Sequence, residues 1–436
     1  MSMPAFSLSL PKVDHSVPQQ STLYRVWVDG QLVKVSHTNM ADFAAFECDR
    51  PMEIVVEVTK AITEAWIRPL SRGLTPELEE NRVHFKISHA QNLCLDLPGQ
   101  IPLFLYANPP ELNRPDARDP KVHFFRSGQV YEVGELELKT DETLYIEAGA
   151  VVKGCVRAYD AENIRIGGRG ILDGDAGRGK PAQFVVLERC KNVLVEDIIM
   201  IEPKSWMLVL GACRGVRVSN LKQIGEVMSS DGIDICGSKD VVIEGCCLLN
   251  NDDNVVIKAL AVRGSRYSWE EDVENIRVRD CVFWNAPCGN AMEIGYELRT
   301  ARVGDIVFEN IDVLCVHGQG AAFSIHNGDR ATVENVRWEN IRVEHHWDKL
   351  VDFRVVHSRY NKDIERGRIR QITLKNIQIV RSPYNAGCTI SLISGFDSSK
   401  PVEGIVFEDF YFDEKKIMNA DDLDLHLRNV RDVTFR

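Results

Sequence analysis

Hydrophobic and polar residues alternate along the first hundred residues in short segments that turn residues divide, for example at Asp29–Gly30. Several short alternating strands with such punctuation indicate an antiparallel β-sandwich. We therefore predict a β-sandwich domain over residues 1–115, with Asn108–Asp119 as its connector to the rest of the chain. The predicted strands are Tyr24–Val28, Leu32–Val35, Ile54–Val58, Ala65–Ile67, His84–Ile87, Leu93–Leu97 and Leu103–Tyr106.

A second pattern fills the remainder of the chain. A short phrase recurs, in which Asn or Asp precedes an aliphatic residue, a variable residue and a second apolar residue, as in NIRIGG and NVLVED. Its recurrence every 23 to 36 residues is typical of a repeat architecture. The first aliphatic positions are Ile164, Val193, Val216, Val241, Ile276, Ile306, Val336, Ile372, Ile405 and Val430.

Each phrase alternates as a strand does, and long helical periodicity is almost absent. One coil of three short strands fits this spacing, whereas a propeller blade needs four strands in about 40 residues. We therefore predict an all-β chain whose residues 116–436 form a right-handed parallel β-helix of about ten coils. Such coils stack around a continuous aliphatic core.

The net charge of the chain argues against some classes of binding partner. Lys and Arg number 52 and Asp and Glu 64, so the net charge is −12, and this field repels nucleic acid and anionic membranes. No apolar run reaches the roughly 18 residues of a membrane span. The segment MSMPAFSLSLPKVDHS lacks the pattern of a secretory signal, so we expect a cytoplasmic protein; its oligomeric state is left open.

The 12 cysteines are scattered and form no C-x-x-C pair. Reduced, buried thiols explain such a distribution. Cys246 and Cys281 fall on the repeat and are predicted to be rungs of its core.

The densest departure from the repeat is Ser230–Asp253, SDGIDICGSKDVVIEGCCLLNNDD. Asp231 and Asp252 are 21 residues apart, close to one coil, so Asp231 is predicted to lie beside Asp252 and Asp253. Like charges raise one another's pKa, and a protonated acid beside a carboxylate is what glycosidic bond hydrolysis requires. Two alternatives are turn aspartates, as predicted for Asp240 and Asp280, and a Ca²⁺ site.

These residues carry a family resemblance. The stretch DGIDICGSKDVVIEGCCLLNNDDNVVIK resembles the active-site motif of the glycoside hydrolase family 28 polygalacturonases, N-T-D-G-x-D followed about 20 residues later by D-D-C-I-A-x-K. The likeness extends to LYIEAGAVVKG and GGRGILDGDAG. The leading sandwich is instead similar to that of the family 49 dextranases and isopullulanases, which share the helix and its three aspartates.

The resemblance implies a role for each aspartate. Asp252 matches the general acid, and Asp231 and Asp253 match the pair that activates water. It implies an inverting glycoside hydrolase that acts on an oligosaccharide or polysaccharide and needs no metal or cofactor.

Two departures from the family motifs bear on the sugar. The G-H-G motif aligns with Gly289-Asn290-Ala291, and the R-I-K motif aligns with Ser324-Ile325-His326. Without that Arg and Lys, a uronate loses its charge-assisted partners. We therefore expect a neutral sugar at the cleavage subsite, as in the dextranases and isopullulanases, or an acidic sugar that is bound differently.

Alternation along the strands predicts which side chains face the cleft. The candidate substrate-binding residues are Asp234, Lys258, Asn290, Glu293, Ser324 and His326. Asp329 and Arg330 either form a turn with its salt bridge or bind sugar. Five aromatic residues could stack on sugar rings, although core packing is the favoured explanation for each: Trp66, Trp206, Trp269, Trp284 and Tyr296.

Three other functions remain open. The chain could be a polygalacturonase or a rhamnogalacturonan-type pectin hydrolase. It could be a polysaccharide lyase, since that class also uses parallel β-helices, but the expected cations are missing. It could also be a carbohydrate-binding β-helix without turnover, although three aspartates at hydrolase spacing argue against this.

Overall fold

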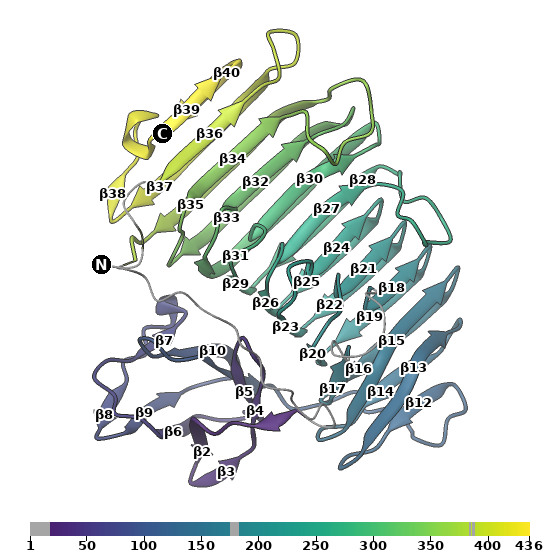
Figure 1. Ribbon diagram of the computed structural model, residues 1–436, viewed down its shortest axis with the longest axis vertical. Helices are drawn as coiled ribbons and strands as arrows, with labels where there is room; N and C mark the ends of the chain where they lie inside the picture. The colour runs from purple at the N-terminus through teal and green to yellow at the C-terminus, as the bar shows by residue number, and fades with distance from the viewer. Residues whose placement is uncertain (1–17, 175–182, 383–384, 386–388) are drawn as a thin grey trace.

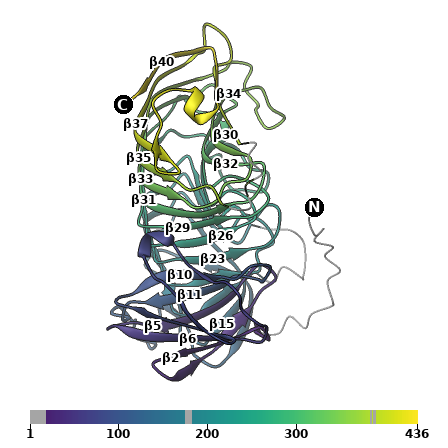
Figure 2. The same ribbon diagram turned by 90° about the vertical axis from the view of Figure 1, so that its left-hand side faces the viewer.

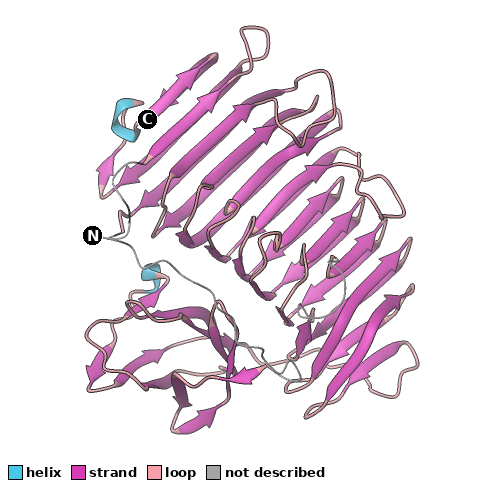
Figure 3. Ribbon diagram, viewed as in Figure 1, coloured by secondary structure: helices cyan, strands magenta, loops and turns pink. Residues whose placement is uncertain are grey.

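The computed structural model describes residues 18–174, 183–382, 385 and 389–436. Strands make up nearly all of its regular structure (Figure 3). The two helices among the described residues are three-residue turns, η1 (Leu70–Arg72) and η2 (Asp421–Leu423), and neither has the length or apolar character that a membrane span requires. The segment MSMPAFSLSLPKVDHS lies outside the described residues, and the cytoplasmic location stays a prediction.

The N-terminal unit is a sandwich of two sheets that enclose their own apolar core (Figure 1). One sheet has the order β1-β4-β5-β11-β10-β7 and the other β3-β2-β6-β9-β8. The strands are β1 (Gln19–Gln20), β2 (Tyr24–Val28), β3 (Gln31–Val33), β4 (Val35–His37), β5 (Asp42–Glu47), β6 (Met52–Val58), β7 (Trp66–Arg68), β8 (Glu77–Glu79), β9 (Arg82–Ile87), β10 (Gln91–Asp96) and β11 (Leu103–Asn108).

The sandwich differs from the predictions in several details, since β1, β5 and β8 were not among the predicted strands. The predicted strand Leu32–Val35 is two strands, β3 and β4, which belong to different sheets because the chain crosses between them. The pairing of β5 with β11 is parallel, although the other pairings in the sandwich are antiparallel.

The rest of the described chain is a parallel β-helix, as predicted. Each of the ten sequence phrases lies in one strand of a single stack, and consecutive phrases pair in parallel. The strands of this stack are β16 (Glu162–Gly168), β19 (Lys191–Glu196), β22 (Arg214–Ser219), β25 (Lys239–Glu244), β28 (Val273–Arg279), β31 (Arg302–Val316), β33 (Thr332–Val343), β35 (Arg368–Ile379), β37 (Val402–Phe412) and β40 (Val430–Phe435).

The residue that opens a phrase is Asn or Asp in most coils and Gly or Gln in the others, and the backbone explains this choice. Asn163, Asp240 and Asn335 have φ between 52° and 58°, in the left-handed region, which Asn and Asp tolerate better than most residues. The aliphatic residue that follows points into the core. In the last coil this residue is Val433, which follows the left-handed Asp432 and pairs with Ile405, so the predicted position Val430 is wrong by three residues.

Two further stacks complete the coils. The second contains β17 (Ile171–Asp173), β20 (Ile199–Ile201), β23 (Lys222–Gly225), β26 (Cys247–Asn250) and β29 (Val282–Asn285). The third contains β18 (Val185–Glu188), β21 (Leu208–Gly211), β24 (Ile233–Cys236), β27 (Val255–Ala259), β30 (Met292–Leu298), β32 (Ala321–Asn327), β34 (Lys349–Val355), β36 (Ile390–Ser394) and β39 (Leu425–Arg428). The remaining strands are β12 (Val122–Phe125), β13 (Val130–Leu138), β14 (Thr143–Ile146), β15 (Val151–Tyr159) and β38 (Lys415–Lys416).

The sandwich packs against the outer face of the second stack (Figures 1 and 2). Phe43, Phe104 and Tyr106 of the sandwich join an apolar cluster with Ile199, Ile224 and other residues of the helix. This contact covers one face of the coils and leaves the face formed by β24, β27, β30, β32 and β34 for a cavity.

Most cysteines behave as predicted. Cys246 and Cys281 lie in the aliphatic core, and the described cysteines are free thiols. Cys155 and Cys288 are only half-buried, which differs from the prediction, because both lie where the chain reaches the surface of a coil. Cys388 lies outside the described residues.

Candidate active site

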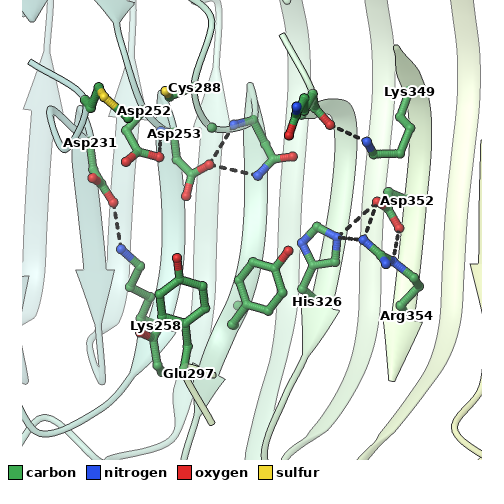
Figure 4. Close-up of a pocket in the computed structure, with 18 of the residues that line it drawn as sticks. Asp231, Asp252, Asp253, Lys258, Cys288, Glu297, His326, Lys349, Asp352 and Arg354 are labelled. Atoms are coloured by element: carbon green, nitrogen blue, oxygen red, sulfur yellow. Dashed lines mark hydrogen bonds and ion pairs between the residues drawn. The ribbon is translucent and has the colours of Figure 1, made fainter. Parts of the chain in front are cut away.

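A cavity of about 690 Å³ opens over the third stack of strands (Figure 4). Its walls come from five successive coils, so it runs along the axis of the helix. The lining residues fall into an acidic group at one end, Asp231, Asp252 and Asp253, and a mixed group at the other, His326, Lys349, Asp352 and Arg354.

Stacking of two coils brings the three aspartates together. Asp231 precedes β24, and Asp252 and Asp253 precede β27 on the next coil. The Gly232 amide donates to the Asp253 carbonyl over 2.8 Å, which fixes the two turns against each other. One carboxylate oxygen from each aspartate lies within 4.8 Å of the other two, as the one-coil spacing led us to expect.

The next coil approaches the aspartates so closely that only glycine fits at position 289. Gly289 has φ +74°, and a Cβ atom there would lie 2.4 Å from the Asp252 carbonyl carbon and the Asp253 nitrogen. The Asn285 side chain also donates to the Asp252 carbonyl, over 2.6 Å. The backbone of Asp252 and Asp253 is therefore fixed by its contacts with the next coil.

The carboxyl groups are placed where protonation is favoured. Burial, and then the nearby Asp231 carboxylate, raise the pKa of Asp252 to about 7. Burial and Asp252 also raise the pKa of Asp253 well above its usual range. Asp252 is the most exposed of the three side chains, so it is the group best placed to exchange a proton with a bound molecule.

Lys258 supplies a positive charge to this acidic end. Its Nζ atom lies 2.7 Å from Asp231 Oδ2 and 2.9 Å from Asp234 Oδ1, and over the Trp206 ring at 3.9 Å. Burial alone lowers the pKa of Lys258, but the carboxylates outweigh it and hold the pKa well above its usual range. The other oxygen of Asp231, Oδ1, accepts no hydrogen bond from the described residues.

Asn290, which stands where the family's G-H-G motif has His, contacts Asp253. Its backbone amide and its side-chain Nδ2 donate to Asp253 Oδ1 over 2.7 and 2.9 Å. Its own Oδ1 accepts from the Ala321 amide over 2.8 Å. Asn290 therefore orients Asp253 and links it to the following coil.

His326 lines the cavity between two acidic partners. Its Nδ1 lies 3.0 Å from Glu293 Oε1, and its Nε2 lies 3.1 Å from Asp352 Oδ2. Burial by itself lowers the pKa of His326, but Glu293 and Asp352 outweigh it and raise the pKa to about 9. The imidazole stacks on the Tyr296 ring, with centroids 4.4 Å apart.

Three predicted substrate contacts need correction. Asp234, Glu293 and Ser324 do lie on the outward side of their strands, but they are buried and do not line the cavity. The reason is that two longer side chains from the next strand of the stack, Lys258 and His326, lie over them. Lys258 pairs with Asp234, and His326 pairs with Glu293. These three residues are placed to support the cavity wall.

The other candidates separate in the same way. Trp206 and Tyr296 line the cavity, whereas Trp269 is buried in a separate apolar cluster and Trp284 packs on Phe104 of the sandwich at 6.0 Å. Trp66 lies in the sandwich strand β7.

Asp329 and Arg330 do not form a salt bridge with each other, because each has another partner. Asp329 is buried and accepts from the amides of Lys362 and Asp363, each over 2.8 Å. Arg330 pairs with the Asp363 carboxylate at 2.8 Å. Neither residue lines the cavity.

The sequence analysis missed the far wall of the cavity, formed by Lys349, Asp352, Arg354, Arg359 and Tyr360. A signal was present in the strand KLVDFRV, where Val351, Phe353 and Val355 point into the core and Asp352 and Arg354 alternate with them. Glu293 and Ser324 occupy the same row as Asp352 in the two preceding strands.

Residues 155–379, more than half of the chain, match the family model for glycosyl hydrolases family 28. The chain therefore belongs to this family.

One relative is a probable polygalacturonase of Arabidopsis thaliana, 27% identical over 155 residues, which cover 31% of this chain and 34% of the relative. The match thus spans about a third of that protein's length.

Solved structures agree on the fold. Dex49A from Penicillium minioluteum has a TM-score of 0.63 at 11% identity, and the alignment covers 96% of this chain and 95% of Dex49A. The polygalacturonase from Erwinia carotovora ssp. carotovora has a TM-score of 0.52 at 16% identity, covering 70% of this chain and 86% of that one. The first alignment takes in the sandwich as well as the helix, in line with the resemblance stated for the N-terminal unit.

Proposed function

We propose that the protein hydrolyses O-glycosidic bonds with inversion, using Asp252 as general acid and Asp231 with Asp253 to activate water. The convergence of three carboxylates within 4.8 Å in one cavity carries this proposal. The raised pKa of Asp252, about 7, supports its role, because a general acid has to hold a proton near neutral pH.

The steps follow from the positions of the groups. Asp252 gives its proton to the oxygen of the leaving sugar as the glycosidic bond breaks. A water molecule attacks the anomeric carbon from the opposite face, and Asp231 accepts its proton. Asp231 suits this task because Lys258 neutralises Oδ2 while Oδ1 accepts no hydrogen bond from the described residues. Asp253, oriented by Asn290, helps to hold the water.

The separation of the carboxylates makes the stereochemistry the first thing to test. Carboxyl groups about 6.5–9.5 Å apart are usual for inverting enzymes and about 5–5.5 Å for retaining ones, so oxygens within 4.8 Å by distance alone favour retention. The family resemblance and the presence of a third carboxylate favour inversion. NMR of the product in the first minutes of digestion distinguishes the two, and an initial anomer identical to that of the substrate would overturn inversion.

For the substrate we propose a neutral sugar at the cleavage subsite. The cations nearest the aspartates are already paired: Lys258 with two carboxylates and His326 with two others. A uronate there would compete with these ion pairs instead of finding a free cation.

A second candidate is a pectin-type substrate, favoured by cations further along the cavity. Arg354 pairs with Asp352 and Lys349 with Asp348, but Arg359 has no carboxylate partner within the described part of the chain and is exposed. Three coils, roughly 14 Å at about 4.8 Å per coil, separate the Asp252 coil from the Arg354 coil. An acidic sugar could therefore bind two or three units from the scissile bond.

A substrate screen distinguishes the candidates. Neutral glucans, fructans, galacturonans and rhamnose-containing oligosaccharides are incubated with the wild type and with Asp252→Asn, which controls for a contaminating hydrolase. Release from neutral substrates alone supports the first candidate. Release from galacturonans alone, reduced in Arg359→Gln, overturns it in favour of the second. No release from any of them would overturn both.

A further inference from the structure

A cysteine and two histidines converge just outside the cavity, where the sandwich meets the helix. Cys315 is the penultimate residue of β31 and His317 follows that strand, while His345 follows β33 one coil later. The Cys315 sulfur and one ring nitrogen from each histidine lie within 4.8 Å of one another. Nothing in the proposed hydrolysis uses these groups.

We propose that Cys315, His317 and His345 form a binding site for a Zn²⁺-class transition metal that ties two neighbouring coils together. Thiolate sulfur and imidazole nitrogen are the ligands that zinc prefers. The Nδ1 atom of His317 and the Nε2 atom of His345 are 3.1 Å apart. Two nitrogens bound tetrahedrally at about 2.0–2.1 Å would be roughly 3.3 Å apart, so the pair needs little movement to share an ion.

The backbone holds the three side chains in place. The Val316 amide donates to the His345 carbonyl over 2.9 Å, and the His317 amide donates to the Asn285 carbonyl over 3.0 Å. Trp347 packs beside the His317 ring at 5.5 Å. The ligands therefore belong to turns that are ordered by the coil pairing itself.

The second ring nitrogen of His345 has a partner of its own. Its Nδ1 atom contacts the Ser382 hydroxyl. Metal-binding histidines commonly donate their other N–H to such a group, which selects the tautomer and turns the free lone pair toward the ion. If Nδ1 carries the proton, Nε2 presents its lone pair toward His317 and Cys315.

The protonation states suit a metal ligand. Burial lowers the pKa of His317, and burial together with His317 and His346 lowers the pKa of His345 to about 3, so both rings are neutral near pH 7. Burial raises the pKa of the Cys315 thiol, so its proton is released to solvent as the sulfur binds the ion. Cys315 and His345 are each 6% exposed, whereas His317 is exposed and opens the site to solvent.

The site would act on the shape of the cavity and not on the bond that is cleaved. Gln319 and Gly320 line the cavity two or three residues after His317, and Lys349 lines it four residues after His345. Lys349 also contacts the Gln319 carbonyl. An ion shared by the two turns would fix this part of the rim and raise the stability of the fold.

Metal titration of the full chain tests the proposal. Protein treated with a chelator is titrated with Zn²⁺ by calorimetry and with Co²⁺ by absorbance, which reports a thiolate-to-cobalt band. We expect one ion per chain and a rise in unfolding temperature on adding Zn²⁺. Cys315→Ser and His317→Gln should weaken binding at least 100-fold, and Ser382→Ala about 10–100-fold.

Matched controls are Cys155→Ser, another cysteine at a coil surface, and His357→Gln, a histidine outside the cluster; both should bind as the wild type does. His317→Gln keeps the proposal testable if Cys315→Ser does not fold, because His317 is exposed. Absence of stoichiometric binding in the wild type would overturn the proposal. So would stoichiometric binding that both ligand variants retain, which would place the ion elsewhere, for example at the three aspartates.

Discussion

At the scale of single residues, the active-site cavity is organised by pairs in which one side chain sets the state of another. Lys258 balances the negative charge of Asp231 by a hydrogen bond to its carboxylate, and Asn290 donates two hydrogen bonds to Asp253. Within the described structure, the Asp252 side chain accepts one hydrogen bond, from the amide of its neighbour Asp253. This sparse bonding and the raised pKa of Asp252, about 7, are the reasons for proposing it as the proton donor.

The first prediction concerns Asp252 itself. Asp252→Asn removes the proton donor while its side chain makes only this local bond, so kcat should fall by about 10³-fold without loss of the fold. The rate of product formation measures kcat, and the circular dichroism spectrum shows whether the fold is kept. Asp240→Asn, a turn aspartate that bonds Asn275, is the matched control and should keep the wild-type rate. Equal activity of both variants would remove Asp252 from the mechanism.

The second prediction is a pH dependence. Because the pKa of Asp252 is raised to about 7, its proton is present below that pH and lost above it. The rate kcat/KM should therefore decline as pH rises through about 7, one decade per pH unit. A pH–rate profile measures this, and a rate that stays level up to pH 9 would contradict the assignment of Asp252 as the acid.

At the scale of strands, the stack β30, β32 and β34 is joined by a charged row. Glu293, His326 and Asp352 come from these three strands in order, and His326 bridges the two carboxylates. The sequence showed which side of the strand Glu293 and His326 take, whereas Asp352 was not among the predicted residues. The sequence did not show that the longer side chains would cover the shorter ones, because this depends on the register between coils.

The charged row predicts a pH-dependent stability. The pKa of His326 is about 9 in the folded protein, which lies above the value near 6.5 of an unfolded chain. The contribution is therefore complete below about pH 6.5, declines above it and is lost as pH passes 9. It amounts to about 3 kcal/mol at most. The unfolding free energy of the wild type minus that of His326→Gln, followed by denaturation, should shrink between pH 6.5 and 9; a constant difference would contradict the ion-pair assignment.

The left-handed residues that open the phrases also form a ladder along the helix. Asn335, with φ 52°, donates to Asp305 Oδ1 over 2.6 Å. Asn335→Ala loses this bond and keeps an unfavourable backbone, so it should destabilise by about 1–2 kcal/mol. Asn335→Gly keeps the backbone favourable and should cost less. Chemical denaturation compares them, and an equal loss in both variants would show that backbone conformation is not what the position selects.

At the scale of the whole molecule, the sandwich is fastened to the helix by polar contacts around the apolar cluster. Glu344 accepts from Arg68 Nη1 and from the Leu70 amide, each over 2.5 Å. Lys222, fully buried, contacts the Asn108 side chain. The division of the chain into domains at residue 115 stays a prediction, since a contact of this kind makes the two units depend on each other.

Glu344→Gln tests this attachment. It leaves Arg68 without one of its buried charge partners and should destabilise the protein by about 3 kcal/mol. Glu57→Gln is the control, because Glu57 pairs with the exposed Arg25 and Arg82 and should lose no more than about 1 kcal/mol. Thermal unfolding and limited proteolysis of the sandwich report the difference. Similar losses in the two variants would show that the polar contact contributes little to the attachment.

The sequence by itself determined the coils and the acid cluster. The phrases mark one strand in each coil because the backbone there requires a left-handed residue before an inward aliphatic one, and both requirements are local. The 21-residue interval from Asp231 to Asp252 is likewise within one residue of the coil there, which runs 22 residues from Ile233 to Val255, so stacking alone brings the aspartates together.

Only the tertiary structure decided the rest of the site. Lys349, Asp352 and Arg354 reach the cavity from a strand about 100 residues beyond the aspartates, and which outward side chains are covered depends on how unequal coils align. The meeting of Cys315, His317 and His345 depends in the same way on the pairing of β31 with β33. Such contacts arise between coils, where no local pattern of residues specifies them.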